Sequence, residues 1–124
     1  MSEFTYRYGP VAEQQLVASG ALASGEIIML ADKRAAWVLG LQAKASGDVY
    51  AVGTTGIGEA VCASAVTFSA GDAVHWDISA NTAIAVGDVA VGDFYLGTAV
   101  KAKTDGQLVV TVDVNAVAGT VEAE

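Results

Sequence analysis

The sequence predicts an all-β protein: a small antiparallel β-sandwich or barrel of short strands, with an extended N-terminal arm. Alanine and valine dominate the 53% of hydrophobic residues, and the chain has fourteen glycines but one proline. Small and β-branched side chains with frequent glycine suit short strands and tight turns. Short apolar runs recur between turn-forming residues, and none shows a sustained helical period with caps, which also favours strands.

A chain of 124 residues is expected to form one domain with one core. We divide it into an N-terminal aromatic arm (residues 1–10), a single β domain (residues 11–114) and an acidic C-terminal tail (residues 115–124), which we expect to be frayed or extended. Because Cys62 is the single cysteine, the domain folds without an internal disulfide.

Aromatic residues alternate with polar ones at the start of the chain. Phe4, Tyr6 and Tyr8 precede a Gly-Pro pair, and a period of two places their rings on one face of an extended segment. Two interpretations stay open: a first core strand, or an arm whose aromatic face docks on a neighbouring subunit. In the second interpretation Phe4, Tyr6, Arg7 and Tyr8 form the interface, and deletion of residues 2–9 leaves a folded domain that attaches weakly.

A short pattern recurs along the chain. Four units, each a small residue, glycine and an acid followed by an apolar run, begin at Ser24, Ser46, Ala70 and Val91. Glycine supplies the positive φ of a turn, and the acid can accept backbone N–H groups where the next strand begins. The pattern fits an internal repeat of turn-plus-hairpin units, and it equally fits any glycine-rich β protein.

The remaining apolar runs supply further strands. Residues 36–41 are too continuously apolar for a solvated sheet face, so we predict a central strand there. Residues 57–63 and 84–86 are weaker strand candidates. Residues 11–18 fit either two helical turns or a strand.

The clearest hairpin lies near the C-terminus. Residues 98–103 and 107–114 flank an Asp-Gly turn, a pairing typical of a β-hairpin. In the second arm the alternation predicts four side chains on the buried face. These are Leu108, Val110, Val112 and Val114.

The charge excludes two classes of partner. Fourteen acids against six bases leave a formal charge of −8, which argues against nucleic acids and anionic membrane surfaces. No apolar run approaches the roughly 20 residues of a membrane helix, and the N-terminus lacks the pattern of a secretory signal. We therefore predict no nucleic-acid and no membrane partner. Lys101 and Lys103, on one face of the hairpin arm, are interpreted as partner contacts or solvated groups.

The sequence offers little catalytic chemistry, and we predict no catalytic residue, cofactor or metal. A zinc site needs three or four ligands, whereas the chain has one histidine and one cysteine. We interpret Cys62 as a small buried residue, and we expect His75 and Asp77 to face the same way, where they could hydrogen-bond. A calcium site from separated loops and a small hydrolase using these three residues remain alternatives. The glycine-rich stretch 53–58 lacks the Gly-Lys-Ser/Thr ending of a phosphate loop and is interpreted as a strand connection.

Several motifs, taken in order, resemble one protein family. The match that carries most detail is Ser69–Asp77, which is similar to an Ala-Gly-Asp-x-Val-Tyr-Trp-Asp signature, with His75 at the usual tyrosine. The order and spacing over about residues 15–114 resemble the small tailed-phage capsid decoration, or capsid cement, proteins. The other matching segments are Ser24–Ile28, Trp37–Leu41, Gly47–Ile57, Leu96–Val100 and Val109–Val114.

This resemblance implies a non-enzymatic decoration protein on the outer surface of the virion. Its partners would be the major capsid protein and further copies of itself in a homotrimer, and its function would be head stabilisation. The alternative is a carbohydrate-binding or adhesive β module of a phage tail or cell surface. In that module Trp37, Trp76 and Tyr95 would be partly exposed platforms for sugar rings.

Overall fold

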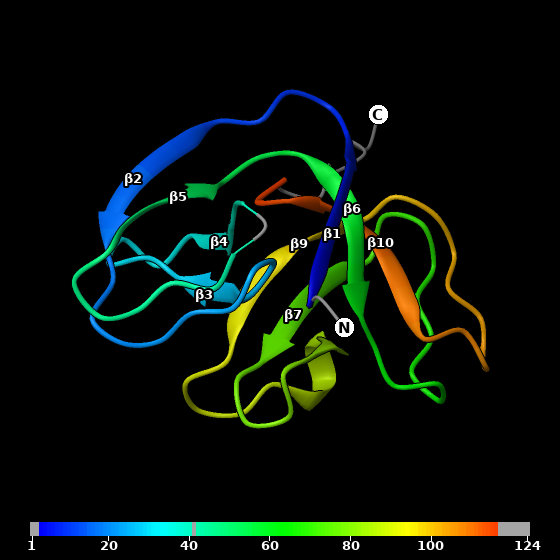
Figure 1. Ribbon diagram of the computed structural model, residues 1–124. Coiled ribbons are helices and arrows are strands. Elements are labelled where there is room, and N and C mark those ends of the chain that lie inside the picture. Colours follow the sequence, from blue (N-terminus) through cyan, green and yellow to red (C-terminus); the bar gives the residue numbers. More distant parts are fainter. Residues whose placement is uncertain (1–2, 41, 117–124) are drawn as a thin grey trace.

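A computed structural model describes residues 3–40 and 42–116 (Figure 1). Over these residues the chain forms ten strands and one 3₁₀ turn, η1 (Val86–Asp88). The strands are β1 (Phe4–Tyr8), β2 (Glu13–Val17), β3 (Ile27–Met29), β4 (Ala35–Val38), β5 (Val49–Gly53), β6 (Ile57–Val61), β7 (Ala73–Asp77), β8 (Thr82–Ala85), β9 (Phe94–Ala99) and β10 (Val109–Val114).

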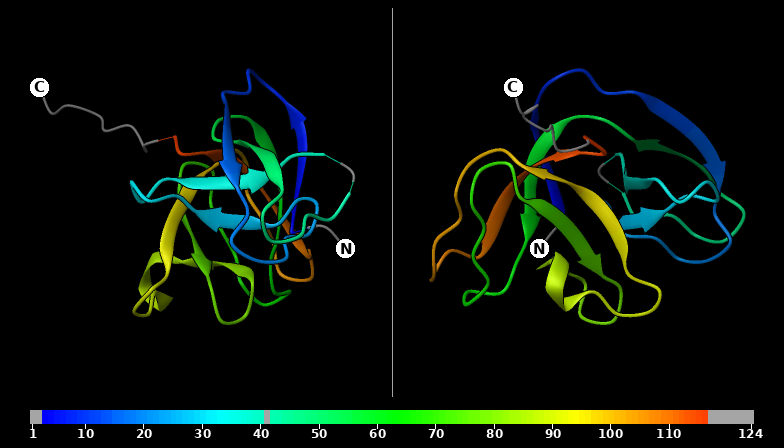
Figure 2. Two further views of the ribbon diagram at one scale, coloured as in Figure 1. Left: turned by 60° about the vertical axis from the view of Figure 1, so that its left-hand side comes forward. Right: turned by 180° about the vertical axis from the view of Figure 1, so that it is seen from behind.

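The strands form two antiparallel sheets. One has six strands in the order β1-β6-β10-β9-β7-β8, and the other has four in the order β2-β5-β4-β3. Figures 1 and 2 show the smaller sheet beside one face of the larger. The all-β prediction is confirmed. Of the sandwich and the barrel that the sequence left open, the arrangement in two sheets corresponds to the sandwich. No helix in the described ranges is long and apolar enough to cross a bilayer.

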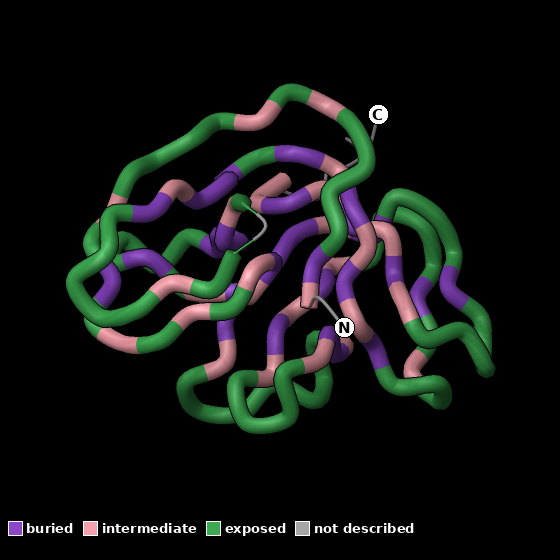
Figure 3. The backbone as a smooth tube through the Cα atoms, viewed as in Figure 1, coloured by how far each residue is buried: buried purple, intermediate pink, exposed green. Residues whose placement is uncertain are grey.

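Alternation along the strands builds the core of the larger sheet. In β10 the side chains of Val110, Val112 and Val114 are buried, while the residues between them are half-buried on the other face. The same period of two buries Val74 and Trp76 of β7, as expected for strands with one face on a core. Figure 3 shows this alternation of buried and half-buried positions.

The central strand predicted at residues 36–41 is β4, whose four residues are all buried. Ala35 and Trp37 join the core shared with the larger sheet, whereas Ala36 and Val38 belong to a second apolar cluster. Because both faces of β4 are covered, its sequence lacks polar alternation. Leu41, the last residue of that predicted run, lies outside the described residues.

The glycine-acid pattern is one turn used repeatedly. In each case glycine has φ between 76° and 95°, and the side chain after it accepts the N–H of the turn's first residue at 2.8–3.1 Å. A fifth copy, missed in the sequence, uses Gln107 in place of the acid. The strands that follow pair differently, since β3 pairs with β4 but β5 and β6 lie in different sheets. The turns span residues 23–26, 45–48, 69–72, 90–93 and 104–107.

The first residues are part of the fold and form β1, an edge strand of the larger sheet. β1 pairs antiparallel with β6, with a register shift between Tyr6 and Tyr8, and Phe4 is 2% exposed within the core. The sequence left two interpretations of this segment, a core strand or a docking arm. The structure supports the core strand at Phe4. Deletion of residues 2–9 would therefore remove core contacts, contrary to our expectation of an intact domain. Docking by the outward residues stays a prediction.

Residues 13–17 form β2, so the strand alternative for that segment is confirmed over the helix. The C-terminal hairpin is shorter than predicted. β9 and β10 pair through Gly97–Ala99, and residues 100–108 form a long connection in which Leu108 is exposed rather than buried.

The first residue of the predicted frayed tail is fixed in place. The Asn115 amide donates to the carbonyls of Ala35 at 2.8 Å and Thr54 at 2.7 Å, and its oxygen accepts the Ala35 N–H at 3.1 Å. Asn115 thus joins the end of β10 to the smaller sheet. The tail residues 117–124 lie outside the described residues.

Candidate functional site

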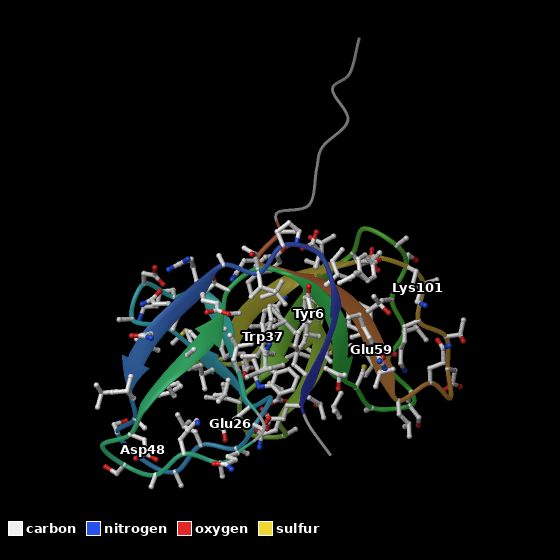
Figure 4. All side chains as sticks on the ribbon, turned by 45° about the horizontal axis from the view of Figure 1, so that its top comes forward. Tyr6, Glu26, Trp37, Asp48, Glu59 and Lys101 are labelled. Carbon is white, nitrogen blue, oxygen red and sulfur yellow. The ribbon has the colours of Figure 1, made fainter. Side chains whose placement is uncertain are left out.

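The predicted interface residues of β1 divide into one buried and three exposed residues. Phe4 points into the core, whereas Tyr6, Arg7 and Tyr8 are exposed. Figure 4 shows Tyr6 beside Trp37, with Glu59 on the other side of β1. The exposed part of the site is therefore a short row of two tyrosines and one arginine along a sheet edge.

A cluster of aromatic rings supports this row from below. The ring of Phe4 lies 4.6 Å from that of Trp37 at 40°, and Tyr6 stacks on Trp37 at 6.2 Å and 11°. Both are favourable aromatic geometries. The Tyr6 hydroxyl also donates to the carbonyl of Gly9, so its ring is fixed at both ends. An open groove of about 310 Å³ lies beside this cluster and is lined in part by Ser24 and Gly40.

The glycine-rich stretch leaves the space that these rings occupy. A Cβ at Gly53 would lie 2.5 Å from the ring of Trp37, and one at Gly58 would lie 2.6 Å from the ring of Phe4. Any side chain at either position would displace a core aromatic ring. The stretch connects β5 to β6, as the interpretation of a strand connection predicted.

Arg7 is held by an ion pair across the sheet. Its guanidinium donates to Glu59 of β6, with the Nε atom 2.6 Å from Oε1. The pair is largely solvent-exposed, so it adds little to stability. The ion pair places the Arg7 side chain on the face of the larger sheet that points away from the core. Tyr6 packs on Trp37 and so lies on the opposite face of β1.

The residues considered for catalysis do not form a site. Cys62 lies in the core, whereas His75 alternates with the buried Val74 and Trp76 and so points to the opposite face of its strand. Burial raises the pKa of the Cys62 thiol, with the charge of Lys103 acting in the other direction. The Cys62 thiol donates weakly to Ala83 at 3.5 Å, as suits a structural residue.

The hydrogen bond considered between His75 and Asp77 is absent. Asp77 instead accepts three hydrogen bonds from Ser79 and Ala80 in the following turn, and these bonds lower its pKa. The buried Nδ1 of His75 has no hydrogen-bond partner among the described residues. Desolvation lowers the pKa of His75, while the charge of Asp93 raises it by less.

The aromatic residues considered for sugar binding are not available as platforms. Trp37 and Trp76 are both buried in the core. Tyr95 is half-buried, its ring edge packs on His75 at 5.5 Å, and its hydroxyl bonds Thr98 at 2.9 Å. Stacking on a sugar needs an exposed ring face, which the two tryptophans lack.

Lys103, which we interpreted as a partner contact or a solvated group, is buried at 2% exposure. Its ammonium donates to three backbone carbonyls of the preceding loop: Ala63 at 2.8 Å, Ser64 at 3.0 Å and Val66. It also pairs through its backbone with Phe68. Lys103 therefore joins the two long loops at one end of the larger sheet, while Lys101 remains exposed (Figure 4).

Across the described ranges, no three His, Cys, Asp or Glu side chains come close enough to hold a metal ion. What the geometry does provide is a rigid two-sheet body with exposed tyrosines on one sheet edge. Those features are typical of a protein that acts by binding another macromolecule.

A family profile described as phage cement protein matches residues 7–115, well over half of the 124 residues. The chain therefore belongs to the phage cement protein family, a structural family associated with the phage capsid. The resemblance in the sequence motifs is thereby confirmed. No curated protein and no solved structure matches the chain.

Proposed function

We propose that this protein binds the outer surface of a tailed-phage capsid, contacts the major capsid protein there and stabilises the head. The observation that carries this proposal is the match to the cement family over residues 7–115. The formal charge of −8 suits an exterior position, where the protein does not contact packaged DNA.

The rigidity of the fold supports a mechanical function. A protein that holds neighbouring capsomers together must transmit force without unfolding. Here the two sheets share one core, and side-chain bonds from Asn115 and Lys103 join segments that lie 37–80 residues apart. Several modest contacts to adjacent capsomers then add through multivalency.

The attachment surface in this proposal is the exposed part of β1, formed by Tyr6, Arg7 and Tyr8 beside the buried anchor Phe4. Tyrosine and arginine are common interface anchors, and both tyrosine rings are exposed on a strand that the core already orders. A preordered strand loses little conformational entropy on binding. We also propose that the protein attaches as a homotrimer, which its molar mass in solution by light scattering would test.

The attachment surface is tested by binding to purified heads that lack the protein. Tyr8→Ala is compared with Leu108→Ala, because the two side chains are similarly exposed, at 55% and 58%. Tyr8 lies in β1, whereas Leu108 lies in the connection between β9 and β10. We expect Tyr8→Ala to weaken binding about tenfold, the cost of losing a moderate interface anchor, and Leu108→Ala to change it less than about twofold. Equal effects would exclude β1 as the attachment surface, and no binding by the unmodified protein would exclude the function.

A further inference from the structure

β2 is an edge strand that lies at the outer rim of the smaller sheet (Figures 1 and 2). It pairs with β5 on one side. On its other side, no backbone hydrogen bond to another described residue reaches it. Four of its five residues are exposed and Leu16 is half-buried, and Figure 3 shows this rim as exposed.

The backbone groups that β2 turns outward can be identified from the bonds at its two ends. The Ala12 carbonyl accepts the Thr54 N–H at 2.9 Å, and the Ala18 N–H donates to Asp48 at 2.8 Å. In an antiparallel pair, every second residue bonds the neighbouring strand. The even-numbered residues therefore bond β5, and the N–H and C=O groups of Glu13, Gln15 and Val17 point away from the sheet.

We propose that β2 pairs antiparallel with β2 of a second copy of this chain, about a two-fold axis at Gln15. In this register Gln15 lies opposite Gln15 of the other copy, and Glu13 lies opposite Val17. All three outward-facing residues of each strand then meet outward-facing residues, so every free N–H finds a carbonyl. The two small sheets become one continuous sheet of eight strands, through the self-complementary contact that a two-fold axis requires.

The side chains of β2 suit contact with a copy of itself. The strand carries one charge, Glu13, and antiparallel pairing places the two carboxylates at opposite ends, about 14 Å apart, beyond the screening length of about 8 Å at physiological salt. Val17 and its neighbour Val49 on β5 are 66% and 64% exposed, beside an open groove of about 480 Å³. The strand also lacks the lysine, proline or bulge that protects edges from pairing.

The small area of the β2–β2 contact indicates that it acts between copies already held on one surface. Two five-residue strands bury less than the roughly 1,000 Å² of a durable interface, so the pairing is weak between free copies. It becomes effective when both copies are held on one surface, since tethering raises their effective concentration. A two-fold contact cannot close a trimer, so on a shell it joins a copy in one trimer to a copy in the next. That location rests on the proposed function, whereas the pairing itself does not.

The test is disulfide trapping in solution, with Gln15→Cys as the probe and Gln14→Cys as the control. At the two-fold axis the Cα atoms of residue 15 lie about 5.5 Å apart, within the range a disulfide spans. Residue 14 lies opposite Leu16 of the other copy, so two thiols at that position are more than about 7 Å apart, too far to bond. We expect Gln15→Cys to form covalent dimers at least about tenfold faster. Equal rates, or faster dimerisation of Gln14→Cys, would overturn the proposal.

A mixing experiment tests the register separately. Glu13→Cys and Val17→Cys should each resist self-linking but form a mixed disulfide when combined, because residue 13 lies opposite residue 17. Self-linking of Glu13→Cys alone would indicate a parallel or shifted pairing and overturn the proposal. So would images of decorated shells in which a strand of the shell protein occupies the edge of β2. If Gln15→Cys dimerises but the protein ignores bare shells, the proposed function fails and the pairing stands.

Discussion

The two sheets differ in how their edges are closed. At the Phe4 end of β1 the larger sheet is covered by its own chain, since the Phe4 N–H donates to the Gly25 carbonyl at 3.0 Å and the Glu3 carboxylate accepts the Ile27 N–H at 2.8 Å. At β8, the backbone of Cys62 forms a parallel β-bridge with Ala83. The smaller sheet leaves β2 open. We infer that the closed edges contribute to stability and that the open edge is available for pairing with another strand.

Two polar side chains, the buried Lys103 and the half-buried Asn115, reinforce the closed region. Lys103 joins two loops of the larger sheet, and Asn115 joins that sheet to the smaller one. Asn115 satisfies backbone groups of the buried Ala35 and Thr54, which would otherwise lose those partners, and Lys103 places its buried ammonium against backbone carbonyls. Substitutions there should therefore lower stability, whereas substitutions of Tyr8 in β1 or at β2 should affect association and leave stability nearly unchanged.

The largest difference is expected within β1. Phe4→Ala removes a core ring that packs on Trp37 and should lower the free energy of unfolding by about 3–5 kcal/mol. Tyr8→Ala removes an exposed ring and should change it by less than about 0.5 kcal/mol. Urea denaturation of both variants measures this contrast. A similar loss of unfolding free energy for the two variants would mean that the buried Phe4 and the exposed Tyr8 contribute equally to stability.

The next effect is at the connection between the sheets. Asn115→Ala removes three side-chain hydrogen bonds, to Ala35 and Thr54, and should cost about 2–3 kcal/mol of unfolding free energy. Asn115 has a φ of +61°, so Asn81→Ala, at a φ of +56°, is the control for backbone conformation and should cost about 1 kcal/mol. Denaturation curves that coincide for these variants would show that the bonds contribute nothing.

A similar or slightly smaller effect is expected at the loops. Lys103→Met retains the aliphatic chain but removes the three hydrogen bonds that the ammonium donates to the carbonyls of Ala63, Ser64 and Val66, at a cost of about 1–3 kcal/mol. Lys101→Met, at an exposed position on the same segment, should stay within about 0.5 kcal/mol. Thermal melts of the pair provide the measurement, and a Lys103→Met variant as stable as Lys101→Met would contradict the assigned role.

The smallest effect is a dependence on pH at His75. Desolvation holds its folded-state pKa below the ordinary 6.5, so as the pH falls the unfolded chain takes up the proton first. Stability is therefore complete above about pH 6.5 and decreases below it, toward the folded-state pKa. His75→Gln should remove this slope below about pH 6.5. A slope that is unchanged in the variant would assign the effect to other groups.

Local patterns in the sequence predicted the parts of the fold that local physics determines. The alternation Val110-Val112-Val114 identified an inner face, and the continuous apolar run around Trp37 identified a strand covered on both sides. The glycine-acid pairs identified four turns because each turn closes within four residues. These predictions required no knowledge of which strands are neighbours.

What the sequence did not reveal depends on contacts between distant segments. Lys103 meets carbonyls 37–40 residues earlier, and Asn115 meets Ala35, 80 residues earlier, so neither role has a local signal. The bond considered between His75 and Asp77 does not form, because Asp77 accepts hydrogen bonds from the turn that follows it. The open edge of β2 also depends on the sheet order, which no local pattern specifies.

Cryo-electron microscopy of bare phage heads mixed with the purified protein tests the central claim most directly. The account predicts density at regular lattice positions on the outer surface, with the exposed tyrosines of β1 directed toward the shell. Heads that remain bare, or density confined to the inside of the shell, would contradict it.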